Sequence, residues 1–263
     1  MKLSYYPGCT LKTKAKDLDR KARACAEKLG VALCEIPEWQ CCGGCYPLGK
    51  DEIAAKLSAC RALQACRETG GEIVTVCSAC HNVLKRVGND LATDEVIRDR
   101  VNRYLAPETP LAGEEKVIHY VEMLRDKVGF DKVKEAVTHP LTGRKTGAYY
   151  GCLLLRPGKV MAFDDPENPR ILEDLLTALG ADAVVWPCRN ECCGGYVALE
   201  DDEAAKAQSR AVLEDAAAHG IETLVTACPL CLYNLKRVES PVKVVYFTEL
   251  LAEALGIGEE EDG

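Results

Sequence analysis

The stretch CCGG at residues 41–44 occurs again at residues 192–195, and this repeat organises the whole chain. Adjacent cysteines rarely share a disulfide, because the ring that they would close is strained. Each pair is followed by two glycines, which let the backbone pass close to another group without a clash at Cβ. The pattern therefore indicates two adjacent thiolates beside a stretch of backbone without side chains, once in each half of the chain.

The repeat extends well beyond the double cysteines. YYPGC at residues 5–9 matches AYYGC at residues 148–152, and EIVTVCSAC at residues 72–80 matches ETLVTACPLC at residues 222–231. Similarity at a fixed period is the signature of an internal repeat, so the sequence predicts a tandem duplication. Three cysteine pairs keep one offset of 151 residues: Cys41 and Cys192, Cys77 and Cys228, Cys80 and Cys231.

Each half predicts alternating strands and helices. A β-rich run ends in a cysteine, and alanine-rich stretches at residues 50–70 and 200–220 have helical spacing and stop at glycine. Such alternation favours an α/β fold with one parallel sheet per half, related by a pseudo-two-fold axis. The cysteines are expected in loops at strand ends, where open α/β sheets bind ligands. Turn-forming residues 138–147 predict domains at residues 1–143 and 144–263.

Composition narrows the class of protein. The chain has 263 residues and a net charge of −8, so a basic surface for nucleic acid is not expected. No apolar run is long enough to span a bilayer, and no secretory signal is predicted, so we expect a cytoplasmic protein. Sixteen cysteines in a reducing compartment indicate metal or redox chemistry rather than a disulfide framework.

Five cysteines recur in each half, which is more than either of two common sites requires. A tetrahedral zinc site uses four thiolates, and an ordinary cubane cluster takes four from a compact cysteine run that this chain lacks. Neighbouring side chains diverge, so adjacent cysteines can both bind a metal when they reach different irons or when one bridges two. The ten candidate ligands are Cys9, Cys41, Cys42, Cys77, Cys80, Cys152, Cys192, Cys193, Cys228 and Cys231.

The glycine pairs are the candidate cofactor-contacting backbone. Without side chains they let the chain fold close to a cluster, and their N–H groups can hydrogen-bond to its sulfur and tune its potential. The Cys-x-x-Cys at a helix start is a further metal clip, since a helix N-terminus favours thiolate charge. The four glycines are Gly43, Gly44, Gly194 and Gly195.

The remaining cysteines, two histidines and two basic pairs are expected mainly to have structural roles. Cys25, Cys60 and Cys66 lie in helical stretches and are expected to pack in the core, while Cys34 falls in a strand candidate. Cys45 and Cys188 are nearer the candidate sites. His81 and His119 could donate protons, but the prevailing interpretation is that of buried, hydrogen-bonded histidines. The pairs at residues 85–86 and 236–237 are interpreted as helix-surface charges, with attraction of an anion as the minor alternative.

The CCG arrangement, with an upstream lone cysteine and a downstream Cys-x-x-Cys, resembles the cysteine-rich domain of the B-type subunit of heterodisulfide reductase. YYGCLLLRP around Cys152, CPLC at residues 228–231, the length and the tandem arrangement share this resemblance, which covers essentially the whole chain. It implies a noncubane 4Fe–4S cluster on each set of five cysteines and a disulfide substrate between the two clusters. It further implies a ferredoxin-like iron–sulfur subunit and a flavoprotein subunit as partners.

The resemblance implies a disulfide-reducing subunit that cleaves its substrate in two one-electron steps. The same domain also occurs in subunits of lactate and glycolate oxidases and of thiol:fumarate reductase, so the motif does not fix the substrate. An electron-transfer subunit of a dehydrogenase or quinone-linked complex, with no disulfide substrate, is therefore the alternative. A zinc-binding scaffold is a third interpretation, which the number of cysteines disfavours.

Overall fold

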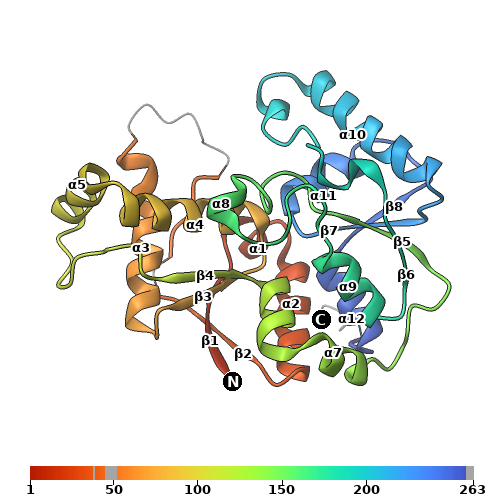
Figure 1. The fold of residues 1–263 in the computed structure, drawn as a ribbon, viewed down its shortest axis with the longest axis horizontal. Coiled ribbons are helices and arrows are strands. Elements are labelled where there is room, and N and C mark those ends of the chain that lie inside the picture. Colours follow the sequence, from red (N-terminus) through yellow and green to blue (C-terminus); the bar gives the residue numbers. More distant parts are fainter. Residues whose placement is uncertain (38, 45–51, 259–263) are drawn as a thin grey trace.

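Two parallel four-stranded sheets form the framework of the chain, as the sequence predicts (Figure 1). The computed structural model describes residues 1–37, 39–44 and 52–258. The first sheet has the order β2-β1-β3-β4 and the second the order β6-β5-β7-β8. The strands are β1 (Lys2–Tyr6), β2 (Ala32–Glu35), β3 (Glu72–Thr75) and β4 (Lys116–His119), then β5 (Lys145–Tyr149), β6 (Asp182–Val184), β7 (Thr223–Thr226) and β8 (Lys243–Tyr246).

Both sheets have the same connectivity, because each half places its first strand at the centre, between its second and third strands. The central pairings are in matching register, with Ser4 opposite Ile73 and Gly147 opposite Leu224. The strands are short, and at least half of the residues are buried in every strand except the edge strands β2 and β6. The tandem duplication predicted from the cysteine spacing is confirmed at the level of topology.

Helices connect the strands in both halves. The first half contains α1 (Cys9–Lys12), α2 (Lys16–Lys28), α3 (Ala54–Glu68), α4 (Ser78–Thr93), α5 (Glu95–Leu105), α6 (Tyr120–Met123), η1 (Leu124–Val128) and α7 (Phe130–Ala136). The second contains α8 (Gly158–Met161), α9 (Ile171–Ala178), η2 (Pro187–Asn190), η3 (Val197–Leu199), α10 (Asp202–Ala218), α11 (Pro229–Lys236) and α12 (Phe247–Ala254).

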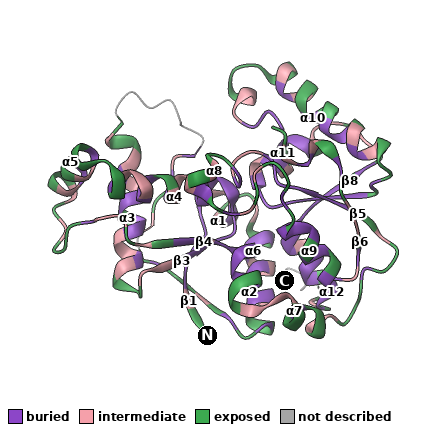
Figure 2. Cartoon of the chain, in the orientation of Figure 1, coloured by how far each residue is buried: buried purple, intermediate pink, exposed green. Residues whose placement is uncertain are grey.

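The two halves exchange helix contacts reciprocally. Helix α2 of the first half packs on α12 of the second, while α9 of the second packs on α6 and α7 of the first. The buried residues of both halves form one continuous hydrophobic cluster, and burial runs through the region between the sheets (Figure 2). The boundary proposed between residues 143 and 144 falls in the connection from α7 to β5.

The described helices include none that is both long enough and apolar enough to cross a membrane.

Candidate metal centre

The first set of cysteines gathers at the carboxyl ends of β1 and β3. Cys9 opens α1 directly after β1, Cys77 is the N-cap of α4, and Cys80 lies in the first turn of that helix. The double cysteine comes from the loop after β2. Parallel strands bring these loops to one edge of the sheet. The Sγ atoms of Cys9 and Cys41 lie 3.3 Å apart, and those of Cys42 and Cys80 lie 3.5 Å apart.

The second set repeats this arrangement around β5 and β7. Cys193 and Cys231 approach to 3.3 Å between their Sγ atoms, and the thiols of Cys152 and Cys192 shift each other's pKa. All five cysteines of the set line one small cavity, whose described lining contains no charged side chain. The other lining residues are Tyr150, Leu153, Gly195, Tyr196 and Leu230.

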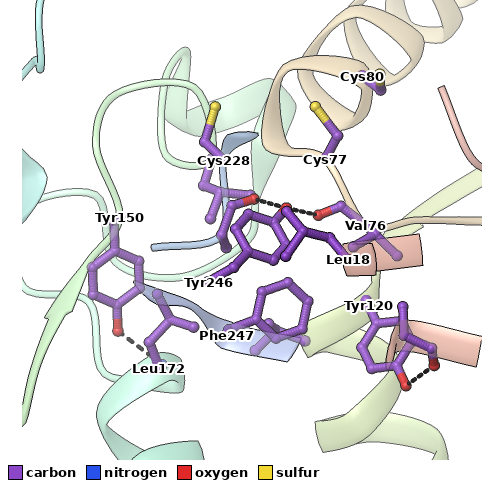
Figure 3. Packing of buried hydrophobic residues seen from close by; sticks show 14 of the residues in the cluster. Leu18, Val76, Cys77, Cys80, Tyr120, Tyr150, Leu172, Cys228, Tyr246 and Phe247 are labelled. Carbon is purple, nitrogen blue, oxygen red and sulfur yellow. Dashed lines mark hydrogen bonds between the residues drawn. The ribbon is translucent and has the colours of Figure 1, made fainter. Parts of the chain in front are cut away.

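The two sets meet at the pseudo-two-fold axis. Cys77 and Cys228, which are 151 residues apart, stand on either side of the junction of the halves, and each thiol shifts the pKa of the other. Their sulfurs point to the same side in Figure 3. The backbone joins there as well, since Ser78 donates to the carbonyl oxygen of Ala227 from both its N–H (3.2 Å) and its hydroxyl (2.6 Å). The ten cysteines therefore form two adjacent groups, one on each side of this junction.

Glycines leave the space that the thiols occupy. A Cβ on Gly8 would lie 2.8 Å from Cys80 Sγ, and one on Gly151 would lie 3.2 Å from Cys231 Sγ. Both glycines have positive φ, of 77° and 61°, which disfavours any side chain at these positions. In the second double-cysteine loop, the N–H of Gly194 donates to Cys192 Sγ at 3.3 Å. The backbone thus contacts the sulfur at one of the glycines that the sequence singled out.

These features, best seen at the second set, suit an iron–sulfur cofactor. Five convergent thiols, a cavity without charged lining and N–H donors aimed at sulfur suit a cofactor that is larger than one ion. Within the described residues, no group of three or more Cys, His, Asp or Glu side chains is arranged to hold a single metal ion.

Crowding separates the pKa values of neighbouring thiols. Hydrogen bonds from Cys41 and Cys80 lower the pKa of Cys42 to about 4, against the opposing effect of burial. A hydrogen bond from Cys152, helped by the N–H groups of Gly194 and Gly195, lowers the pKa of Cys192 to about 6. Thiolates packed this closely repel one another, so a full set of five ionised cysteines needs compensating positive charge.

Access to the two sets is similar. Cys41 and Cys192, the first members of the double cysteines, are both exposed, whereas Cys42 and Cys193 are both buried. The N-terminal cysteines, Cys9 and Cys152, are half-buried. Each set is therefore open to solvent beside the first cysteine of its adjacent pair and closed on the side of the core.

The cysteines outside the pattern largely follow their predicted roles. Cys25, Cys60 and Cys66 are fully buried in helices, where burial raises the pKa of each to about 12. Cys34 is exposed on β2. Cys188 lies in η2, where burial and a hydrogen bond with the Asp215 carboxylate raise its pKa to about 11. Cys45 lies outside the described residues.

The two histidines differ from each other. His119 is hydrogen-bonded as predicted: Nε2 lies 3.0 Å from the carbonyl oxygen of Val76, and Nδ1 accepts from the N–H of Val121. His81 is fully buried, but neither of its ring nitrogens has a hydrogen-bond partner among the described residues. The prediction of a hydrogen-bonded histidine is therefore wrong for His81, whose Nε2 lies 3.5 Å from a carboxylate oxygen of Glu122.

The interpretation of Lys85 as a helix-surface charge is also wrong. Its side chain is mostly covered, and Nζ donates to the carbonyl oxygen of Met161 in the other half. Its counterpart Lys236 is exposed. Sequence reasoning also missed Asn82 and Tyr246, which make contacts across the junction. For Tyr246 the sequence offers one signal, because it stands at the end of β8 as His119 stands at the end of β4.

Comparison with known protein families gives a match over most of the chain. The model of the CCG cysteine-rich domain matches the chain twice, at residues 3–85 and 146–236. These two segments contain all ten cysteines of the two sets. The chain belongs to the CCG cysteine-rich domain family. Each CCG domain spans the first three strands of its own half and the cysteine loops between them.

Full-length relatives of this CCG protein are subunits of oxidoreductase complexes. It is 30% identical to the 8-methylmenaquinol:fumarate reductase membrane anchor subunit of Wolinella succinogenes, over 99% of this chain and 94% of that protein. It is 27% identical to the B-type subunit of the Ferredoxin/F(420)H(2)-dependent CoB-CoM heterodisulfide reductase of Methanosarcina acetivorans, over 100% and 92%. The resemblance to this heterodisulfide reductase subunit is therefore confirmed over the full length.

A solved structure shares the fold. A hypothetical protein from Helicobacter pylori superposes with a TM-score of 0.70 at 12% identity. The match covers 99% of this chain and 50% of that one, so this chain spans half the length of the solved protein. At this level of identity the likeness concerns the fold alone.

Proposed function

We propose that this chain is the disulfide-reducing subunit of a heterodisulfide reductase-like complex, and that each set of five cysteines holds a noncubane 4Fe–4S cluster. The observation that carries the proposal is the meeting of the two sets at Cys77 and Cys228, where Ser78 hydrogen-bonds to the carbonyl oxygen of Ala227 (Figure 3). Two separate electron carriers would not need to share a boundary. Adjacent sets suit a substrate that both sites contact at the same time.

The chemistry requires two electrons and two protons for each disulfide, which yields two thiols. A cluster of this kind supplies one electron at a time, so one cluster per half matches the demand. The chain's own contribution is geometric. The cysteines hold the two sites side by side, and the exposed Cys41 and Cys192 mark the sides from which substrate or partner can approach.

Partner subunits follow from the need for electrons. The sequence contains no flavin or ferredoxin motif, so the electrons come from another chain. A ferredoxin-like iron–sulfur subunit, and behind it a flavoprotein subunit, are the partners that the resemblance to heterodisulfide reductase implies. The name of the Methanosarcina acetivorans protein describes it as dependent on ferredoxin or F(420)H(2), which is consistent with an external electron donor.

Electron transfer without a disulfide substrate is the second candidate. It is favoured by the Wolinella succinogenes relative, whose name assigns it to a quinol:fumarate reductase. In that case the same two sites would pass electrons between partner subunits, and the cavity beside the second set would bind no disulfide.

One experiment separates the two candidates. Anaerobically purified protein is analysed for iron and sulfide, reduced, and mixed with a panel of charged and uncharged disulfides. Electron paramagnetic resonance (EPR) then follows both clusters while released thiol is measured. Spectral change at both clusters together with thiol release is the expected result. If no disulfide alters either spectrum while a redox partner still exchanges electrons, the chain is an electron-transfer subunit.

A further inference from the structure

Two residues at equivalent positions reach the junction between the cysteine sets. His119 ends β4 and Tyr246 ends β8, and each is the N-cap of the following helix. The third residue of that helix, Glu122 or Glu249, accepts a hydrogen bond from the N–H of its N-cap residue, at 2.7 and 2.6 Å. Because this capping box fixes the backbone at both positions, the two side chains project from rigid points.

Tyr246 contacts both halves through one atom. Its hydroxyl lies 2.7 Å from the carbonyl oxygen of Val76 and 2.9 Å from that of Ala227, and the ring is fully buried (Figure 3). Val76 and Ala227 are themselves equivalent residues, 151 positions apart. Each carbonyl belongs to the peptide that leads directly into Cys77 or Cys228. A single hydroxyl therefore ties together the two peptides from which the facing cysteines extend.

The remaining contacts at the junction are less symmetric. Ser78 bonds to Ala227, but Pro229 stands at the matching position in the second half and has no N–H to return the bond. His119 Nε2 lies 3.0 Å from the carbonyl oxygen of Val76, and the carbonyl oxygens of Val76 and Ala227 both raise its pKa against the larger lowering by burial. Since Nδ1 of His119 accepts from Val121, the proton lies on Nε2, which donates to Val76. The hydroxyl of Tyr246 has one proton, which is shared between the two equivalent carbonyl oxygens in a three-centre hydrogen bond.

We propose that Tyr246 is a positioning residue that fixes the separation of the two cysteine sites by holding the peptides before Cys77 and Cys228 together. The part of this proposal that concerns the spacing of two clusters rests on the function proposed above. The part that concerns the two peptides does not. A substrate bridging the two sites would need their spacing to be constant. A buried hydroxyl that hydrogen-bonds to both peptides provides that constancy without touching either cysteine.

Tyr246→Phe is the direct test, because it removes only the hydroxyl. The matched control is Tyr120→Phe. Tyr120 is equally buried, and its hydroxyl donates to the carbonyl oxygen of Ala22 at 2.8 Å, away from the cysteine peptides. Phenylalanine already stands at the equivalent position in the second half, Phe247, so the control substitution suits its site. Both variants lose one buried hydroxyl, and only Tyr246→Phe frees the two peptides.

Amide hydrogen exchange gives the first readout, and it does not depend on any cofactor. Peptides covering residues 74–80 and 224–231 should both exchange about two- to tenfold faster in Tyr246→Phe than in the parent. Tyr120→Phe should leave both peptides at the parental rate. The proposal is overturned if either peptide keeps its rate in Tyr246→Phe, or if the control accelerates both to the same extent.

Magnetic interaction between the clusters gives the second readout. In fully loaded, reduced protein, the coupling between the two spins depends steeply on their separation. Tyr246→Phe should therefore alter the EPR line shape of both clusters at unchanged iron content, and Tyr120→Phe should not. An unaltered line shape in Tyr246→Phe would refute a role in spacing. If iron analysis of the parent finds no clusters, the proposed function fails, while the exchange rates still decide the role of Tyr246.

Discussion

The helices that follow the two cysteine sets are equivalent in sequence but have different neighbours. Asn82 in α4 is buried and donates to the carbonyl oxygens of Leu153 and Arg156, both at 2.8 Å, in the loop after the first cysteine of the other half. At the same position in α11, Tyr233 is 60% exposed. Helix α4 is thus covered by the second half, whereas this part of α11 faces solvent.

The difference originates in the length of one connection. In the second half, the segment from Cys152 to the start of α9 at Ile171 contains α8 and extends over α4. In the first half, α2 begins at Lys16, soon after Cys9, and no comparable segment is available to cover α11. The cysteine loops have kept their arrangement in both halves while the surrounding segments have diverged. The symmetry is strictest where we propose that the clusters bind.

Serine substitution in each half provides the strongest test of this symmetry. Cys42→Ser and Cys193→Ser each remove one buried thiol from one set. We expect each variant to keep about half of the parental iron, because the other set of five remains intact. Iron and sulfide analysis with EPR of the surviving cluster measures the result. Equal loss of both clusters from either substitution would show that the two sets form one inseparable site.

The unequal covering of α4 and α11 predicts unequal costs at equivalent positions. Asn82→Ala leaves two buried carbonyl groups without their donor, so it should lower the free energy of unfolding by about 2 kcal/mol. Tyr233→Ala, the matched control, should change it by no more than about 0.5 kcal/mol, since the side chain is exposed. Urea denaturation measures both values. Similar costs would mean that α8 does not cover α4 in solution.

The repeat in the sequence was enough to predict the topology. Constant spacing of three cysteine pairs shows that both halves share one fold, and alternating strand and helix patterns give its class. The convergence of the ten thiols also follows, because parallel strands deliver their loops to one edge. These inferences depend only on local pattern and on the geometry common to all parallel sheets.

Contacts between the halves could not be predicted in the same way. Lys85 has the sequence context of a surface charge, and it is covered only because α8 comes from a distant segment. The aromatic ring of Tyr246 predicts burial, but nothing local reveals that its hydroxyl lies between two equivalent carbonyls. One feature of the sequence did indicate that the surroundings of the two sets differ, namely the unequal length of the segments after them. From Cys80 to β4 at Lys116 the chain is much longer than from Cys231 to β8 at Lys243, because α4 is longer than α11 and α5 has no counterpart there.

The halves also differ beside their first cysteines, where Tyr150 of the second half takes the place of Pro7. The Tyr150 hydroxyl donates to the buried carboxylate of Glu173, whose Oε1 lies 3.4 Å from Nε of Arg189. Burial raises the pKa of Glu173 above its ordinary value, against the hydrogen bond from Tyr150 and the charge of Arg189. This network gives the second half a pH-sensitive group with no counterpart at Pro7.

The sign of the resulting effect follows from linkage. Below the pKa of Glu173 in the unfolded chain, the carboxyl group is protonated in both states and carries no penalty. As the pH rises from there through the higher pKa of the folded state, ionisation favours the unfolded chain and stability falls. The loss is about 1.4 kcal/mol for each unit by which the two pKa values differ.

Glu173→Gln cannot ionise, so its stability relative to the parent should increase as the pH is raised from about 4 to 8. Urea denaturation at a series of pH values gives this difference, in which the other titrating groups largely cancel. Tyr150→Phe removes a hydrogen bond that stabilises the carboxylate, so it should steepen the loss in a chain that retains Glu173. A relative stability that falls with pH would mean that Arg189 outweighs burial and that the carboxylate stabilises the fold.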